Sequence, residues 1–265
     1  MSRISIHKLR EMKAEGRRFA MVTAYDYPSA RLVEQAGIPV ILVGDSLGMT
    51  VLGYENTLPV TLDEMLHHTA AVARGTRRAL VVADMPFLSY QVSVEQAIAN
   101  AGRFLKEARA GAVKIEGGAF RAPTVAALVS NGIPVLGHIG LTPQSLQVLG
   151  GYKVQGRKLD EAARLRADAL ALQEAGVFAL VLECLPVELA REITASIRVP
   201  TIGIGAGPHC DGQVLVMHDM LGINTEFKPR FLRQYLNLND QISGAVQHYI
   251  KDVKCGDFPN TNEQY

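Results

Sequence analysis

The chain has 265 residues, of which 48% are hydrophobic, with 27 basic and 26 acidic side chains. This length suits a single α/β barrel, and the hydrophobic content is sufficient for a large core. A net charge of +1 creates no field that would recruit nucleic acid or an anionic membrane, so we expect a small-molecule partner.

Eight short runs of β-branched and aliphatic residues recur along the chain. They are FAMVT (19–23), VILV (40–43), ALVVA (79–83), AVKI (112–115), PVLGHI (134–139), ALVLE (179–183), PTIGIG (200–205) and VLVM (214–217). Nearly continuous apolar runs predict parallel strands that are covered on both faces. The last run also suits one turn of an amphipathic helix, and that alternative stays open.

Stretches rich in Ala and Leu separate these runs and predict helices. They are YPSARLVEQAG (27–37), SVEQAIANAGRFLKEARAG (93–111), APTVAALVSNG (122–132) and DEAARLRADALALQEAG (160–176). Each closes on a glycine, as helices often do. Two further helices are expected, one starting from Thr61 and one over about 240–253.

The alternation of strands and helices predicts a (β/α)8 TIM barrel, with the whole chain, 1–265, forming one domain. Residues 226–265 are expected to form a C-terminal helical extension that packs outside the barrel or against a neighbouring subunit. No GxGxxG motif follows the first strand, which disfavours a dinucleotide fold. The glycine-rich GIGAGPHCDGQ (203–213) lacks a Walker lysine and is interpreted as a tight βα loop rather than a phosphate cradle.

The cysteines and the N-terminal segment suggest where the protein works. Cys184, Cys210 and Cys255 are too few and too scattered for a disulfide framework or a zinc site. The N-terminal segment carries mixed charges without an apolar run, and no stretch approaches the roughly 20 apolar residues of a membrane span. We therefore expect a cytoplasmic protein with no membrane partner.

Polar residues end five successive predicted strands, the second to the sixth. They are Asp45, Asp84, Glu116, His138 and Glu183. In a (β/α)8 barrel the active site is built at the carboxyl ends of the strands. Any one of these residues could be a helix N-cap or a loop carboxylate, but five in succession favour a site. Carboxylates without clustered His or Cys indicate Mg²⁺ or a similar hard cation.

Two neighbouring positions suggest roles beyond metal binding. Lys114 and Glu116 are two residues apart in one strand, so both face the barrel interior. They either form a buried ion pair that closes the barrel, or Lys114 holds a substrate carboxylate or oxyanion while Glu116 supports a metal. His138 either orients substrate or is a structural histidine.

Glu183 ends the strongly apolar run LVLE. A carboxylate in such a setting can have a raised pKa and act as a general base; the alternative is a rim carboxylate bonded to a loop amide. Together the residues predict metal-assisted abstraction of a proton α to a carbonyl. They do not identify the substrate.

Longer motifs point to a family. They are TAYD (23–26), VGDSLGMTVLGYENTLPVT (43–61), ADMPF (83–87), VKIEGG (113–118), GHIGLTPQS (137–145), GGYKVQGR (150–157), LECLPVELA (182–190) and GIGAGPHCDGQVLVMHDMLG (203–222). From about residue 3 to 250 the chain closely resembles the ketopantoate hydroxymethyltransferase (3-methyl-2-oxobutanoate hydroxymethyltransferase) family.

The resemblance implies a homodecamer of TIM barrels in pantothenate biosynthesis. It would transfer a one-carbon unit from the co-substrate 5,10-methylenetetrahydrofolate to 3-methyl-2-oxobutanoate, giving 2-dehydropantoate. The family's metal ligands correspond to Asp45, Asp84 and Glu116, with Mg²⁺ as the expected ion. Its substrate-binding positions correspond to Asp45, Ser46, Asp84, Lys114 and His138. Its proton acceptor corresponds to Glu183.

Two other functions are compatible with the same residues. A Mg²⁺-dependent 2-oxo acid or phosphonate lyase or mutase would use a similar site, although such lyases often carry a catalytic Cys after a middle strand and GHIGLTPQS has none. A non-catalytic metal-binding or metabolite-binding barrel is the second alternative. The GGYKVQGR loop has the glycines of a lid, and we place the folate near it, although no stacking platform is recognisable in a chain without Trp.

Overall fold

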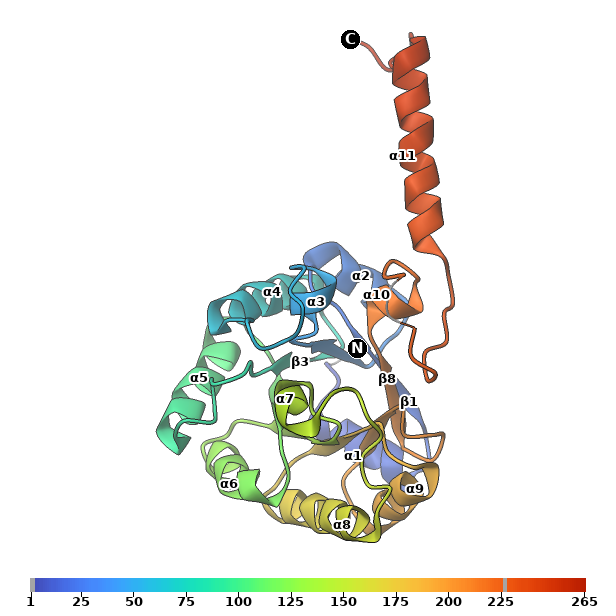
Figure 1. Ribbon diagram of the computed structural model, residues 1–265. Coiled ribbons are helices and arrows are strands. Elements are labelled where there is room, and N and C mark those ends of the chain that lie inside the picture. The colour runs from blue at the N-terminus through green and yellow to red at the C-terminus, as the bar shows by residue number, and fades with distance from the viewer. Residues whose placement is uncertain (1–2, 226–227) are drawn as a thin grey trace. The chain divides into compact units, whose positions relative to one another are not determined.

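The computed structural model describes residues 3–225 and 228–265 (Figure 1). Within these residues, eight parallel strands close into a barrel in which each strand pairs with the next and β8 pairs with β1. The strands are β1 Phe19–Thr23, β2 Val40–Val43, β3 Leu80–Asp84, β4 Ala112–Glu116, β5 Val135–Gly140, β6 Ala179–Glu183, β7 Thr201–Ile204 and β8 Gly212–Leu215. The predicted (β/α)8 fold is confirmed.

Helices surround the strands as an outer ring, most visibly α4, α5, α6, α8 and α9 in Figure 1. Their bounds are α1 Ile6–Ala14, α2 Tyr27–Gln35, α3 Leu47–Thr50, α4 Leu62–Gly75, α5 Val94–Lys106, α6 Ala122–Ser130, α7 Leu146–Leu149, α8 Leu159–Glu174 and α9 Val187–Ser196, with 3₁₀ turns η1 Ala119–Arg121 and η2 Pro143–Ser145. Side-chain caps start several of them, and the predicted start of α4 after Thr61 is confirmed by a capping box with Glu64.

The predicted end of one helix is wrong. Helix α5 stops at Lys106, five residues before the expected Gly111. Residues 107–111 instead form an irregular turn in which Arg109 has a φ of 61°, so a non-glycine residue adopts the left-handed conformation here. The glycines expected after α2, α6 and α8 do have positive φ.

The last strand–helix–strand repeat also differs from the prediction. The structure describes every residue between β7 and β8, and this stretch contains no helix. Asp211 anchors the connection, because its Oδ2 accepts from the Thr201 backbone N–H at 2.8 Å and from Lys13 Nζ at 2.8 Å. The expected last strand starts two residues earlier than predicted, and helix α10 (Met217–Met220) begins just after it, so both interpretations of VLVMHDM are partly correct.

The two-residue periodicity of the strands sorts apolar residues into two layers. Val40, Leu42, Leu80 and Val82 belong to the cluster inside the barrel, together with Leu9 of α1. The alternate residues of the same strands pack against the helices. Toward the carboxyl ends of β3 to β6 the interior positions are occupied by polar residues. Strand alternation therefore places these side chains at the mouth of the barrel.

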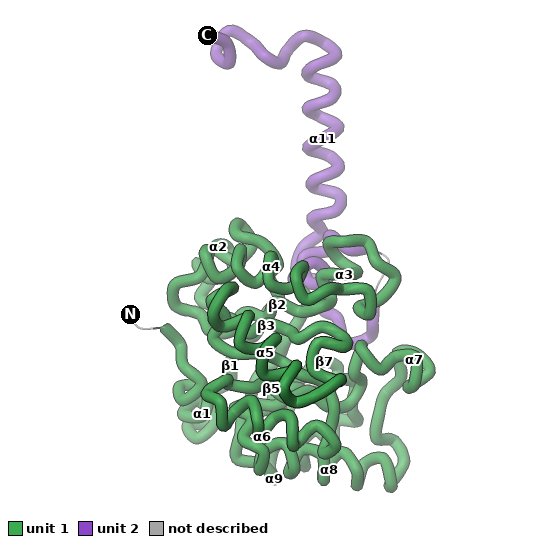
Figure 2. The backbone as a smooth tube through the Cα atoms, turned by 90° about the vertical axis from the view of Figure 1, so that its left-hand side faces the viewer, with its two compact units in different colours: residues 1–216 green, residues 217–265 purple. Residues whose placement is uncertain are grey.

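The contacts divide the chain into two compact units, residues 1–216 and residues 217–265 (Figure 2). The second unit contains α10 and α11 (Leu238–Cys255), which extends the predicted helix by two residues at each end. The expected start of the extension, at 226, lies outside the described residues. None of the helices in the described part is long and apolar enough to cross a membrane.

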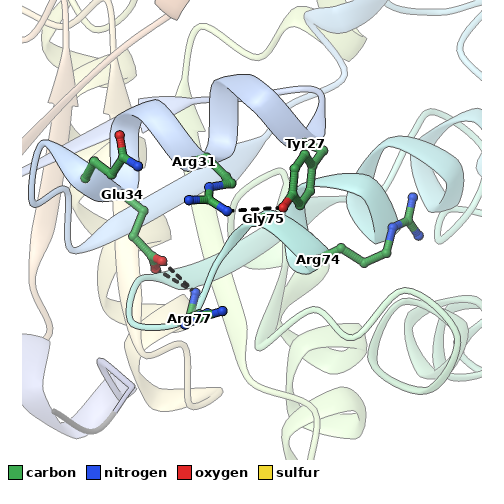
Figure 3. A pocket seen from close by; sticks show the side chains of 7 residues that line it. Tyr27, Arg31, Glu34, Arg74, Gly75 and Arg77 are labelled. Atoms are coloured by element: carbon green, nitrogen blue, oxygen red, sulfur yellow. Dashed lines mark hydrogen bonds between the residues drawn. The ribbon is translucent and has the colours of Figure 1, made fainter.

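A carboxylate on α2 fixes the turn that leads from α4 into β3. Glu34 accepts backbone N–H bonds from Arg77 at 2.8 Å, Arg78 at 2.6 Å and Ala79 at 3.0 Å. It lines a shallow pocket of about 160 Å³ together with Tyr27, Arg31, Gln35, Arg74, Gly75 and Arg77 (Figure 3). Partial burial raises the pKa of Glu34, but the N–H donors outweigh it and hold the pKa below its usual value.

Replacing Glu34 by Ala is therefore expected to lower the free energy of unfolding by about 1–3 kcal/mol, because three backbone donors lose a charged acceptor. The free energy of unfolding of Glu34→Gln, which keeps one acceptor oxygen, should lie between those of the wild type and Glu34→Ala. A carboxyl group whose pKa is depressed in the folded state stabilises the fold at pH values above its unfolded-state pKa. This stabilisation is lost as the pH falls through the folded-state pKa. In urea denaturation the midpoints of the wild type and Glu34→Ala should thus differ at pH 7, and the difference should shrink below about pH 4. Equal midpoints at pH 7 would contradict this role of Glu34.

Candidate active site

Strand register brings the predicted polar residues into one cluster at the mouth of the barrel. Asp84 is paired with Lys114 across β3 and β4, and Glu116 is paired with His138 across β4 and β5. These four residues and Asp45, which follows β2, are each less than 5% exposed. The structure therefore brings together five residues from four separate segments of the chain.

Lys114 pairs with acids on two strands. Its Nζ lies 2.8 Å from Asp84 Oδ1 and 3.4 Å from Glu116 Oε1. The predicted pair with Glu116 exists, but the closer partner is Asp84. Burial opposes the charge on Lys114, yet the neighbouring carboxylates outweigh burial and raise its pKa. Lys114 is therefore a fully charged ammonium inside the barrel.

The three acids carry more negative charge than Lys114 alone compensates. Burial raises the pKa of Asp45 well above its usual value, and repulsion from Asp84 and Glu116 adds to this effect. Burial also raises the pKa of Asp84, although Lys114 partly offsets it. Burial acts in the same direction on Glu116, but Lys114 and His138 outweigh it and lower the pKa. Two buried carboxylates are thus short of positive charge.

This shortage suits a divalent cation. The atoms that could bind a metal here are all carboxylate oxygens, which hard cations prefer as ligands. Asp84 Oδ1 is buried and accepts no well-aligned hydrogen bond from the described residues, although Lys114 Nζ is 2.8 Å away. Across the described part of the chain, no three His, Cys, Asp or Glu side chains already have the arrangement of a metal-ligand group. The donor chemistry fits Mg²⁺, while the ammonium of Lys114 bridges Asp84 and Glu116.

His138 connects the acidic cluster to Glu183. Its Nδ1 lies 3.3 Å from Glu116 Oε1, and its Nε2 lies 3.2 Å from Glu183 Oε2. Burial and the charge of Lys114 lower its pKa, but the two carboxylates outweigh them and raise the pKa to about 9. Lys114 Nζ also lies 3.3 Å from His138 Nδ1, so His138 does not stand alone at its strand end.

The position of Glu183 is fixed by its backbone. Its carbonyl accepts from the N–H of Leu141 at 2.9 Å, and the N–H of Cys184 donates to the Ile204 carbonyl at 2.8 Å. Gly140 has a φ of 98°, and a Cβ on it would lie 2.2 Å from the Glu183 carbonyl oxygen, so only glycine fits there. The Glu183 side chain is 15% exposed, against 3% for His138. It is therefore the acid that an entering molecule can reach.

Ser46 and the glycine-rich loop lie near this cluster. Ser46 Oγ is 2.8 Å from the Tyr25 hydroxyl. The Tyr152 hydroxyl, in the predicted lid GGYKVQGR, donates to Met49 Sδ at 3.7 Å. Burial raises the pKa of Tyr152, and the charges of Glu183 and Asp45 raise it further, which indicates that this loop lies close to the acids.

Three functional candidates were not indicated by the strand-end pattern: Tyr25, Tyr90 and Gln144. Tyr90 Oη accepts from the Glu116 backbone N–H at 3.0 Å. Gln144 donates from its side chain to Asp45 and from its backbone to Glu116. Each lies in a loop that follows a strand, so the signal that could have found them is a polar residue in a loop at the carboxyl end of the barrel, beyond the strand end itself.

Several solved structures share this fold. A phosphoenolpyruvate phosphomutase from Streptomyces platensis subsp. rosaceus superposes with a TM-score of 0.63 at 15% identity, over 95% of this chain and 88% of that chain. A 2,3-dimethylmalate lyase, described as a member of the PEP mutase/isocitrate lyase superfamily, superposes with a TM-score of 0.61 at 18% identity, over 98% and 91%. These identities show a common barrel and nothing finer.

Sequence relatives are much closer. The 3-methyl-2-oxobutanoate hydroxymethyltransferase of Moorella thermoacetica is 59% identical over 100% of this chain and 98% of its own length. The enzyme of the same name from Carboxydothermus hydrogenoformans is 57% identical over 100% and 96%. The family model for ketopantoate hydroxymethyltransferase matches residues 3–261. The match over nearly the whole chain shows that it belongs to the ketopantoate hydroxymethyltransferase family.

Proposed function

We propose that this chain transfers a hydroxymethyl group from 5,10-methylenetetrahydrofolate to 3-methyl-2-oxobutanoate, giving 2-dehydropantoate in pantothenate biosynthesis. Overall the reaction consumes one water and releases tetrahydrofolate. The observation that carries the proposal is the buried group of Asp45, Asp84 and Glu116 around Lys114, joined through His138 to the accessible Glu183. This arrangement suits removal of a proton beside a carbonyl, in a chain whose relatives bear the name of this transferase.

Each part of the cluster has a distinct role in the proposal. Asp45, Asp84 and Glu116 would hold Mg²⁺, which when bound supplies Lewis-acid polarisation of the keto oxygen. The ammonium of Lys114 offsets the negative charge of the substrate carboxylate. Ser46, held by the Tyr25 hydroxyl, orients the substrate through its own hydroxyl.

Glu183 performs the proton transfer. Its carboxylate takes the C3 proton of 3-methyl-2-oxobutanoate, and the C3 electron pair forms the new bond to the methylene carbon of the folate. That carbon exchanges its two bonds to folate nitrogens for the bond to C3 and a bond to the hydroxyl of water. Tetrahydrofolate leaves with the C3 proton on one nitrogen and the remaining proton of water on the other. His138 Nε2, 3.2 Å from Glu183 Oε2, orients the carboxylate and lies in the substrate pocket. We place the folate at the rim near GGYKVQGR. Burial and the charges of Glu183 and Asp45 raise the pKa of Tyr152, so this loop lies next to the proposed site.

A turnover assay tests this proposal against the lyase or mutase alternative. The purified chain, Mg²⁺ and 3-methyl-2-oxobutanoate should yield 2-dehydropantoate only when 5,10-methylenetetrahydrofolate is present, and EDTA should abolish the product. Cleavage of a C4 2-oxo acid without folate would overturn the proposal. Lyases of this kind often use a reactive cysteine, and residues 141–145 contain none. Cys184 is a poor substitute, because burial and the charge of Glu183 raise its pKa to about 12.

A proposal about assembly rests on the apolar stripe of α11. Ile242, Val246, Tyr249 and Val253 recur at coiled-coil spacing on this helix, and each is 47–56% exposed. We propose that the stripe docks on a second copy of the chain within a cytoplasmic homodecamer, whose mass would be ten times 28.7 kDa. The free state of Cys184, Cys210 and Cys255 suits the cytoplasm.

Replacing Val246 by Asp is expected to break this assembly, because it places a charge in the centre of the stripe. Analytical ultracentrifugation should then show smaller species than the wild-type chain at equal concentration. Lys251→Asp places the same side chain at an exposed position outside the stripe and serves as the control. Identical sedimentation of all three proteins would exclude α11 from the interface.

A further inference from the structure

One buried amide links the acids that would hold the metal. Gln144 lies in η2, just after β5, and is 5% exposed. Its Nε2 donates to Asp45 Oδ2 and to the Met85 carbonyl, both at 2.9 Å. Its backbone N–H donates to Glu116 Oε2 at 3.0 Å. A single residue therefore donates to two of the three acids.

The orientation of this amide is determined by its neighbours. The Tyr90 hydroxyl accepts from the Glu116 backbone N–H, and as a donor it is closer to Gln144 Oε1, at 2.7 Å, than to the Glu116 carbonyl, at 3.4 Å. Gln91 Nε2 also donates to this oxygen, at 3.1 Å. A flipped amide would set Oε1 against the Met85 carbonyl, with two acceptors facing each other. The NH₂ group consequently faces the acids.

Neutral donation suits a metal site better than another positive charge would. Buried carboxylates are costly unless they accept hydrogen bonds. Gln144 supplies such bonds to Oδ2 of Asp45 and Oε2 of Glu116. This leaves Oδ1 of Asp45 for a cation, while Oε1 of Glu116 faces Lys114 and His138. Unlike Lys114, the amide brings no charge that would repel the cation. Partners of this kind fix the rotamers of metal ligands.

We propose that Gln144 is a positioning residue that orients Asp45 and Glu116 for a divalent cation, and that Tyr90 fixes the orientation of its amide. The inference rests on the proposed function, since it concerns the same site. Gln144 itself touches neither the reacting carbon nor the substrate; it acts through the two acids.

Mn²⁺ affinity, measured from the electron paramagnetic resonance signal of free Mn²⁺, tests this inference without substrate. Gln144→Met keeps the volume of the side chain but removes its donors, and we expect the dissociation constant to rise about 10–100-fold. Gln144→Asn, whose amide is one methylene too short to reach Asp45, should show a loss in the same direction and serves if the Met variant does not fold. Gln35→Met, at an exposed position of α2, is the matched control and should bind as the wild type does.

The outcomes separate this inference from the proposed function. All measurements are made where circular dichroism shows a native fold, and thermal unfolding of the metal-free variants is recorded in parallel. An unchanged dissociation constant in Gln144→Met, even with a lower melting temperature, means that the residue is merely structural and overturns the inference. Failure of the wild-type chain itself to bind Mn²⁺ would instead remove the metal site from the proposed function.

Discussion

Glu183→Gln is expected to abolish exchange of the C3 hydrogen of 3-methyl-2-oxobutanoate with deuterated water and to lower kcat by about 10²–10⁴-fold, because an amide cannot accept the proton. Binding of substrate in the presence of Mg²⁺ should persist, since among the described residues only His138 joins Glu183 to the acidic cluster. Nuclear magnetic resonance follows the exchange, and calorimetry follows the binding.

The control for this variant is Glu188→Gln on α9, five residues further along the chain. Glu188 is paired with Arg191 at the surface, and its side chain is 66% exposed. It should retain wild-type exchange and turnover. Undiminished exchange in Glu183→Gln would exclude Glu183 as the base, whereas loss of substrate binding would show that the carboxylate acts in recognition.

Lys114→Met is expected to have the second large effect, on both stability and activity. Removing one partner of a buried ion pair leaves carboxylates without compensation, which costs about 3–5 kcal/mol of unfolding free energy. Asp84 would feel this most, since Lys114 Nζ lies 2.8 Å from its Oδ1. Turnover should also fall, because the substrate carboxylate loses its cation. Urea denaturation and steady-state kinetics measure the two effects.

The loss of stability in Lys114→Met should depend on pH and on metal. Without the ammonium, the folded-state pKa of Asp84 rises further above its unfolded value of about 3.9. A raised carboxyl pKa means that the folded state binds more protons than the unfolded state. The variant should therefore recover stability as the pH falls toward the unfolded-state pKa of Asp84. Mg²⁺ should restore part of the lost stability at pH 7, since it supplies the missing positive charge.

Lys8→Met provides the comparison, because Lys8 forms an exposed pair with Glu11 on α1. Its unfolding midpoint should match that of the wild type at every pH. A Lys114→Met protein as stable as this control would mean that the buried acids are already protonated in the wild-type fold.

The sequence predicted the barrel well because the parallel strands are continuous apolar runs with polar residues at their carboxyl ends. Alternation along β4 correctly placed Lys114 and Glu116 on one face. The partners across strands could not be predicted in this way, since they depend on the register of the closed barrel. For this reason the contact between Lys114 and Asp84, and the bridge from Glu116 through His138 to Glu183, emerged only from the structure.

The errors have a common origin in loops. No helix separates β7 from β8, and α5 ends early in a turn where Arg109 is left-handed. Gln144 and Tyr90 belong to loops that fold back over the acids, and loop conformation depends on tertiary contacts that a linear pattern does not contain. The substrate, likewise, is suggested by family membership and not by the arrangement of the acids.

The most direct test of the account is hydrogen exchange by the wild-type chain alone. Incubated in deuterated water with 3-methyl-2-oxobutanoate and Mg²⁺, without folate, the protein should exchange the C3 hydrogen, and EDTA should stop it. The experiment tests the substrate, the metal and the base together. No exchange with Mg²⁺ present, or equal exchange after EDTA, would contradict a metal-assisted removal of the C3 proton by this site.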